Sequence, residues 1–195
     1  MKPAITILFI LIFVTFNSNS QVNYNRSCIT TDLAIGNGIY GIGSLKIGTE
    51  LPIMKNQKIG MRIGAGLDIS EKIGFGILFS PYQFNKWDIL MACDLTRMFG
   101  STYLYHNESK NSYSEDLYSF NNTNLIIPSI AFRFPGAKLF TFHLTCGWAF
   151  GLNDPNITLV SGPGKEESLK NINNRLLGGY RLEFGGTFRI RKWKE

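Results

Sequence analysis

The chain has 195 residues, and its 20 Lys and Arg residues against 14 Asp and Glu residues give a formal net charge of +6. Beyond the N-terminus no stretch approaches the roughly 18 uninterrupted apolar residues of a membrane-spanning helix, so a helical membrane protein is excluded. The basic balance does not indicate nucleic-acid binding, because only Arg189–Lys194 is a dense basic cluster and most other Lys and Arg residues stand singly.

The N-terminus has the pattern of a cleaved export signal. Lys2 is followed by the apolar stretch Ala4–Phe16, and small serine residues precede a candidate cut before Gln21. The apolar stretch is shorter than the roughly 20 residues that a membrane-spanning helix needs. We therefore expect a signal peptide over residues 1–20 and a single mature domain over residues 21–195.

Runs of alternating apolar and polar residues fill most of the mature chain. In the third run, Met61, Ile63 and Ala65 fall on one face of a strand, while Arg62 and Asp68 fall on the other. Such runs of ~10 residues suit strands that cross a membrane at a tilt. They predict an all-β fold, an eight-stranded antiparallel up-and-down transmembrane barrel. The predicted strands cover residues 28–36, 39–53, 58–70, 73–84, 87–99, 125–135, 138–151 and 176–192.

Two of these strands have weaker patterns. The first is short and lightly apolar, and the sixth contains Pro128, which cannot donate a hydrogen bond within a sheet. We expect a bulge or a shorter strand at Pro128.

The lengths of the connections agree with a transmembrane barrel. If the first strand rises from the periplasm, the periplasmic turns fall at residues 54–57, 83–86 and 135–137, and all three are short. The long connections, residues 100–124 and 152–175, then both lie on the outer side. Bacterial barrels have short periplasmic turns and longer external loops.

The mature chain resembles the small eight-stranded outer-membrane β-barrel proteins of Gram-negative bacteria. The export signal, the eight runs and the last-strand segment Gly185–Ile190 carry this resemblance. It implies residence among outer-membrane lipids and insertion by the barrel-assembly machinery. In that family the last strand usually ends in an aromatic residue, whereas here Arg191–Glu195 follow, and Trp193 or Phe188 would have to serve. The resemblance implies an architecture and not a biochemical role.

The inward positions of the predicted strands collect charges of both signs. Eight strands leave an interior about wide enough for side chains to fill, where an unpaired charge is costly. We therefore expect a plugged core with ion pairs, such as Glu50 or Asp68 with Arg62 or Arg181. The alternative is a narrow ion-conducting path lined by the same groups. The candidate network comprises Lys46, Glu50, Arg62, Asp68, Asp88, Asp94, Arg133, His143, Arg181, Glu183 and Arg189, with Asp32 as a further candidate.

The outward positions predict a lipid-facing wall. Aromatic residues near the strand ends are expected to form girdles at the depth of the lipid headgroups. Cys93 and Cys146 also fall on this face, and the three cysteines are expected to be free thiols. The girdle residues are Trp87, Trp148, Phe150, Phe188 and Trp193, with Tyr82 and Phe84.

No motif in the sequence indicates catalysis. His143 lies between threonines on an inward face, which suits a hydrogen-bonded core role. His106 is close in sequence to Glu108 and Ser109, but nothing fixes these three side chains relative to one another. Zinc, calcium and phosphate-binding motifs are absent from the sequence. We expect no catalytic residues, no cofactor and no metal.

The long connections are the better candidates for a functional surface. The candidate contact residues Tyr103, Tyr105, Tyr113 and Tyr118 stand among Ser and Asn, a composition that suits adaptable contacts. In the second connection, Lys165–Lys170 can form a helical turn. The simpler interpretation of both connections is a mobile, solvated surface loop.

The sequence therefore predicts a non-enzymatic integral outer-membrane protein. Its external loops, 100–124 and 152–175, are expected to bind an extracellular partner or to support envelope integrity. Three alternatives remain open: a small pore or transport accessory, an enzyme acting on envelope lipid, and a soluble exported barrel that holds a lipid.

Overall fold

The computed structural model describes residues 27–37, 39, 41–54, 57–84, 87–109, 112–135, 140–176 and 178–191. The predicted signal peptide and Trp193 lie outside these residues, as do the side chains of Tyr82 and Phe84.

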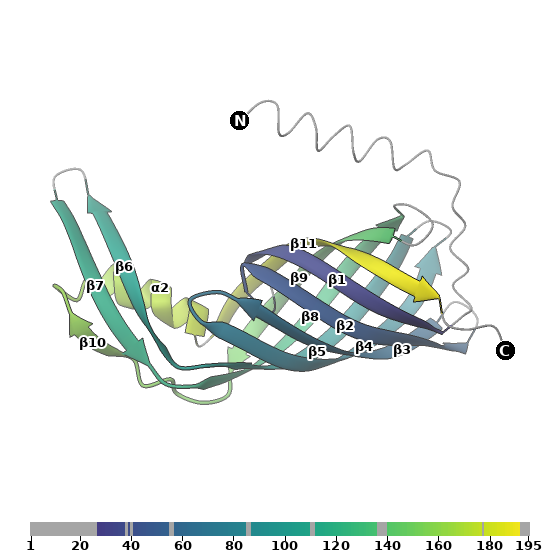
Figure 1. Ribbon diagram of the computed structural model, residues 1–195, viewed down its shortest axis with the longest axis horizontal. Coiled ribbons are helices and arrows are strands. Elements are labelled where there is room, and N and C mark those ends of the chain that lie inside the picture. Colours follow the sequence, from purple (N-terminus) through teal and green to yellow (C-terminus); the bar gives the residue numbers. More distant parts are fainter. Residues whose placement is uncertain are drawn as a thin grey trace, which may run out of the picture.

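Eight antiparallel strands form a closed barrel in the order β1-β11-β9-β8-β5-β4-β3-β2 (Figure 1). The predicted eight-stranded antiparallel barrel is confirmed, and each barrel strand overlaps a predicted one with ends that differ by a few residues. The barrel strands are β1 (Cys28–Asn37), β2 (Gly43–Met54), β3 (Gln57–Leu67), β4 (Glu71–Phe84), β5 (Trp87–Met98), β8 (Thr123–Pro135), β9 (Phe140–Gly151) and β11 (Gly178–Arg191).

Burial alternates residue by residue along these strands. In β2, Leu45 and Ile47 are exposed on the outer wall, while Lys46 and Glu50 are almost completely buried inside. Successive side chains of a strand point to opposite faces, so the alternation in the sequence becomes an apolar outside and a charged inside. This polarity is the reverse of a water-soluble barrel.

The strand β8 passes through Pro128 without a bulge. Ile126 and Ser129 keep the same register against β9, while Ile127 and Pro128 make no ladder pair with it. Proline has no backbone N–H, so the ladder is interrupted locally and resumes in register. The bulge or shorter strand expected at Pro128 is wrong.

Both long connections fold into regular structure. The first forms the hairpin of β6 (Ser101–Ser109) and β7 (Ser112–Phe120), and β10 (Thr158–Ser161) from the second connection joins β7 at its other edge. The helix α2 (Glu166–Leu176) follows β10 and contains most of the expected helical turn. Regular strands and a helix therefore replace the loop conformation that the simpler interpretation gave to these residues.

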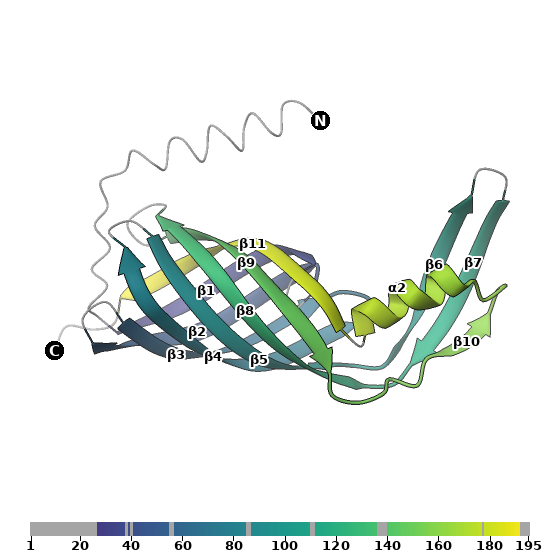
Figure 2. The ribbon, with the colours of Figure 1, turned by 180° about the vertical axis from the view of Figure 1, so that it is seen from behind.

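We call β6, β7, β10 and α2 the projecting module. It extends beyond the barrel end opposite to the one where β1 begins and β11 ends (Figures 1 and 2). No helix within the described part of the chain is long and apolar enough to cross a membrane.

Candidate functional site

The barrel interior contains a first charged cluster around Arg133 of β8. Its guanidinium pairs with both Glu50 of β2 and Asp88 of β5. Ser80 Oγ donates to Asp88 Oδ1 over 2.5 Å, and Lys58 Nζ lies 3.5 Å from Glu50 Oε2. All five residues are at most 5% exposed. The Arg133 guanidinium bridges the two carboxylates, and Lys58 supplies a second positive charge beside Glu50.

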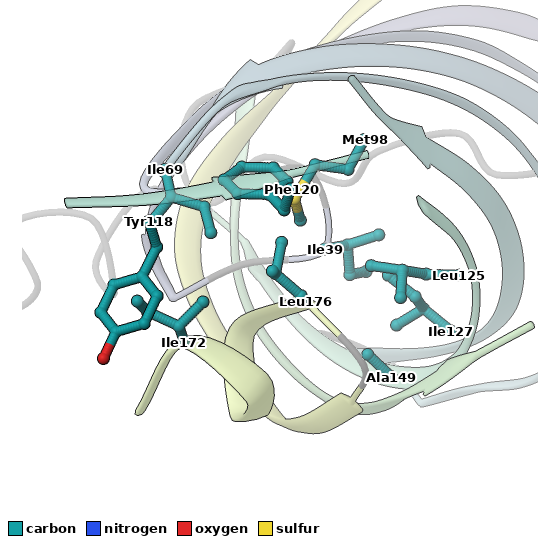
Figure 3. Close-up of a cluster of buried hydrophobic side chains, with 10 residues drawn as sticks. All are labelled: Ile39, Ile69, Met98, Tyr118, Phe120, Leu125, Ile127, Ala149, Ile172 and Leu176. Carbon is teal, nitrogen blue, oxygen red and sulfur yellow. The ribbon is translucent and has the colours of Figure 1, made fainter. Parts of the chain in front are cut away.

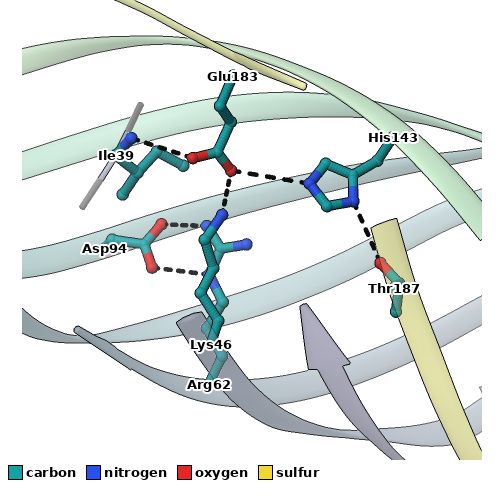
Figure 4. A network of polar contacts seen from close by, with 7 residues as sticks. All are labelled: Ile39, Lys46, Arg62, Asp94, His143, Glu183 and Thr187. Carbon is teal, nitrogen blue, oxygen red and sulfur yellow. Dashed lines mark hydrogen bonds and ion pairs between the residues drawn. The ribbon is translucent and has the colours of Figure 1, made fainter. Parts of the chain in front are cut away.

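A second charged cluster is drawn in Figure 4. Its Lys46 lies closer than Glu50 to the start of β2, the end of the strand on the module side. Lys46 pairs with Glu183, and Arg62 forms a two-pronged pair with Asp94, with Nε–Oδ1 and Nη2–Oδ2 distances of 2.8 and 2.5 Å. Glu183 Oε2 also accepts a hydrogen bond from the backbone N–H of Ile39. This bond holds Ile39, which is completely buried, against the barrel interior.

His143 is part of this second cluster. Its Nδ1 lies 3.2 Å from Thr187 Oγ1, and its Nε2 lies 4.0 Å from Glu183 Oε1 (Figure 4). His106 lies in the projecting module, with Nδ1 3.1 Å from the exposed Glu115 carboxylate. The side chains of Glu108 and Ser109 lie outside the described residues. The two imidazoles are therefore in separate regions, and the described residues contain no cluster suited to a metal ion.

The remaining predicted lumen residues contribute to further contacts. Asp68 pairs with Lys72 over 2.8 Å, and Arg189 Nη2 lies 3.9 Å from Asp88 Oδ2. Arg181 is buried, and Asp32 is half-buried. Glu50, however, contacts Arg133 and Lys58, so its expected pairing with Arg62 or Arg181 is wrong.

The set of lumen residues predicted from the sequence does not include two buried lysines. Lys58 and Lys72 are 5% and 2% exposed, and both point inward. Lys58 is an even number of residues from the inward-facing Arg62 in β3, and Lys72 is an even number of residues from the inward-facing Gly76 in β4. Extending the alternation to the strand ends identifies both. With them the described inner face carries nearly balanced charges: Lys46, Lys58, Arg62, Lys72, Arg133, Arg181 and Arg189 against Asp32, Glu50, Asp68, Asp88, Asp94 and Glu183.

An apolar cluster occupies the mouth of the barrel on the module side (Figure 3). Ile172 and Leu176 of α2 are 1% and 0% exposed, and they pack against inward residues from several strand ends and turns. The signal in the sequence is a change along the inward positions, from charged to apolar, as in Asp94 and Met98 of β5. The cluster comprises Ile39, Ile69, Met98, Tyr118, Phe120, Leu125, Ile127, Ala149, Ile172 and Leu176.

Asp116 of β7 fixes α2 to the hairpin. The carboxylate is completely buried, and it accepts hydrogen bonds from the backbone N–H groups of Gly164 and Lys165 and from Ser168 Oγ, over 2.9, 3.1 and 2.8 Å. These donors lie at the start of α2, where the helix dipole also favours a negative charge. Because the cap comes from a distant strand, the local sequence of α2 gives no signal for it.

The tyrosines of the hairpin are less available than expected. Tyr118 is 2% exposed and belongs to the apolar cluster, and its burial raises the pKa of the phenol. Tyr103 is half-buried against the same cluster, and Tyr105 Oη accepts a hydrogen bond from Asn171 Nδ2 of α2 over 2.7 Å. The side chain of Tyr113 lies outside the described residues. The prediction that Tyr118 contributes to a contact surface is therefore wrong.

The comparisons with known proteins give a structural match alone. No protein-family model and no curated protein matches the chain. A major outer membrane protein from Thermus thermophilus is similar in structure, with a TM-score of 0.56 and 13% sequence identity over 84% of this chain and 99% of that chain. The fold is that of a small outer-membrane β-barrel. The N-terminal barrel domain of Pseudomonas aeruginosa OprF is also similar, with a TM-score of 0.46 and 9% identity over 85% of this chain and 98% of that chain.

The outer wall of this outer-membrane barrel fold is apolar. Trp87, Trp148, Phe150 and Phe188 are 45–51% exposed, as expected for residues that face lipid near the strand ends. Cys93 is exposed on the same wall, and the three cysteines form no disulfide. Exposure of such a large apolar surface to water is unfavourable, so a hydrocarbon environment suits this wall.

Proposed function

We propose that the protein is a non-enzymatic integral outer-membrane protein that holds the projecting module outside the cell as a surface for a partner. The polarity of the barrel carries this proposal. Large apolar side chains such as Ile63, Phe75 and Leu95 are 44–59% exposed on the wall, while the charged side chains fill the interior. Only a surrounding hydrocarbon phase makes that arrangement stable.

Two features favour a sealed barrel over a pore. The charged clusters cross the lumen, because Arg133 connects β8 with β2 and β5 while Arg62 connects β3 with β5. The apolar cluster then fills the module-side mouth, where Leu176 lies centrally among the surrounding strands (Figure 3). An ion would have to pass both regions, and the buried apolar cluster opposes its entry.

The first test combines fractionation with conductance. We expect the protein to stay with outer membranes through detergent-free washing and to migrate differently on gels before and after heating. In planar bilayers it is expected to give no discrete currents. Release by washing would favour the soluble lipid-binding barrel, and discrete currents would favour the pore.

The second test addresses the side of the membrane that the module faces. In a background without the three native cysteines, Val160→Cys places a thiol on β10, where Val160 is 57% exposed. Met54→Cys places one at the opposite barrel end, where Met54 is 67% exposed. A membrane-impermeant maleimide is expected to label the first variant in intact cells and the second only after lysis. The opposite pattern would overturn the external placement.

A further inference from the structure

The sheet of the projecting module has two unlike edges. Its β10 edge is only four residues long, shifts register between Leu159 and Ser161, and is followed by Gly162–Gly164 with a proline at its centre. Its β6 edge is nine residues long and pairs with β7 without interruption, from Ser101 opposite Phe120 to Ser109 opposite Ser112. Short length, bulges and proline are the usual protections of an edge strand. Only the β10 edge has them.

The outer edge of β6 has no neighbouring strand, because β4, which pairs with the preceding strand β5, does not extend as far as β6. The strand β4 begins at Glu71, and the hydrogen bond from Phe99 N–H to Glu71 O, 3.1 Å long, lies where β5 leaves the barrel. The N–H of Gly100 is taken by Asn122 Oδ1 over 2.7 Å. From Ser101 onward, among the described residues, β6 pairs with β7 alone. Every second residue of such a strand directs its N–H and C=O outward.

We propose that β6 binds an extended, basic segment of a partner protein as an additional strand. The strand contains no Lys, Arg or Pro that would oppose such pairing. Apart from the buried Asp116, β6 and β7 contain the acidic residues Glu108 and Glu115 and neither Lys nor Arg, so a basic segment is favoured over an acidic one. This inference rests on the proposed function, since it requires the module to face an aqueous space.

The outer face of the sheet offers places for the side chains of the added strand. Leu104 is 40% exposed and lies opposite Leu117, and Thr102 and His106 flank it on the same face of β6. A polar hollow of about 660 Å³ lies at the foot of β6, lined by Ser101, Thr102 and residues of the facing segment up to Asn122. Backbone pairing would supply affinity, and these contacts would supply selectivity.

A second copy of the chain is a poor occupant of this edge. Its β6 strand contains Glu108 and neither Lys nor Arg, so pairing two β6 strands would bring like charges together and supply no basic residue.

The test uses the full-length protein in detergent micelles and a synthetic peptide, Lys-Thr-Val-Thr-Val-Thr-Lys. Binding is measured by fluorescence anisotropy and located by hydrogen exchange. We expect binding that protects alternate backbone amides of β6. For the counterpart peptide with Glu at both ends, we expect an affinity that is lower by a factor of about 10 or more. The peptide with its central amides N-methylated is expected not to bind, because it cannot donate to the ladder.

The matched variants place the same charge on the two edges. Leu104→Lys puts one lysine on β6, where Leu104 is 40% exposed, and Val160→Lys puts one on β10, where Val160 is 57% exposed. We expect the β6 variant to lose about 10-fold or more in affinity for the basic peptide and the β10 variant to change less than about 2-fold. Equal losses in both variants, protection outside β6, undiminished binding of the N-methylated peptide, or β6 protection that rises with protein concentration alone would each overturn the proposal.

Failure of this inference is distinguishable from failure of the proposed function. Heat-dependent gel migration and the maleimide labelling of Val160→Cys are measured on the same preparations. A protein that passes both and binds no peptide remains an outer-membrane barrel and contradicts only the inference on β6.

Discussion

The barrel and the projecting module are parts of one chain with opposite polarity. In the barrel, Ile63 is 59% exposed while Arg62 beside it is 4% exposed. In the module, Phe120 is 3% exposed while Glu115 is exposed to solvent. The same alternation of strand side chains serves both regions, and only the side that holds the apolar residues changes.

This difference identifies the surroundings of each region. Apolar side chains turn away from water, so the apolar residues of the module, such as Phe120 and Leu176, point inward and join the cluster at the barrel mouth. The barrel has no water to avoid on its outer wall, and its polar groups gather inside to satisfy one another. The apolar cluster at the mouth marks the change, because there the inward positions become apolar as the chain leaves the barrel.

The largest expected effect comes from removing the central cation of the lumen. Arg133→Ala leaves the buried carboxylates of Glu50 and Asp88 without their shared partner, and breaking such a pair costs about 3–5 kcal/mol. We expect the urea midpoint of the folded band, followed by gel migration in lipid vesicles, to fall accordingly. Lys170→Ala, on the exposed surface of α2, is the control and should leave the midpoint unchanged. A midpoint equal to wild type would show that the network does not stabilise the barrel.

A charge placed on each outer surface tests the comparison directly. Ile63→Arg puts a cation near the middle of β3 on the lipid-facing wall, where the cost is about 2–4 kcal/mol at the bilayer midplane. Leu104→Arg puts the same charge on the module, where Leu104 is 40% exposed and a surface substitution costs about 0.5 kcal/mol or less. Urea unfolding of both variants in vesicles measures the difference. Equal effects would contradict the assignment of lipid and water to the two surfaces.

The sequence predicts the barrel better than the module for a physical reason. Along β2 and β3 the contrast between Ile or Leu outside and Lys, Arg or Glu inside is strong, so the alternation is evident. In β6 the two faces carry Tyr103 and Tyr105 against Thr102 and Leu104, a weak contrast that does not reveal a strand. The four residues of β10 are too few to show any period.

The alternation of residues along a strand does not predict which charged side chains pair within the lumen. Parity places Glu50 and Arg133 inside, but it carries no information on their height or angle around the barrel. Those depend on the stagger between strands, such as the register that sets Asp88 opposite Arg133. Capping of α2 by Asp116 is likewise a contact between segments far apart in sequence.

A smaller and local effect is expected for Asp116→Ala. Two backbone N–H groups and the Ser168 hydroxyl lose their buried acceptor, which costs about 1–3 kcal/mol. We expect faster hydrogen exchange in α2 and proteolysis near Lys165, with the urea midpoint of the barrel unchanged. The control is Glu115→Ala, one residue away with an exposed side chain. If the barrel midpoint also falls, the two regions do not unfold independently.

The smallest expected effect compares one tyrosine hydroxyl from each region. Tyr105→Phe removes the acceptor of the 2.7 Å bond from Asn171 Nδ2, a contact that holds α2 against β6 and contributes about 0.5–1.5 kcal/mol. Tyr180→Phe removes a hydroxyl on the outer wall whose contact is Cys146 Sγ at 3.8 Å, a weak acceptor. Hydrogen exchange of α2 should therefore accelerate a few-fold in the first variant, by about the factor that this energy gives, and stay unchanged in the second. An unchanged rate in Tyr105→Phe would leave Asp116 and the apolar cluster as the contacts that hold α2 in place.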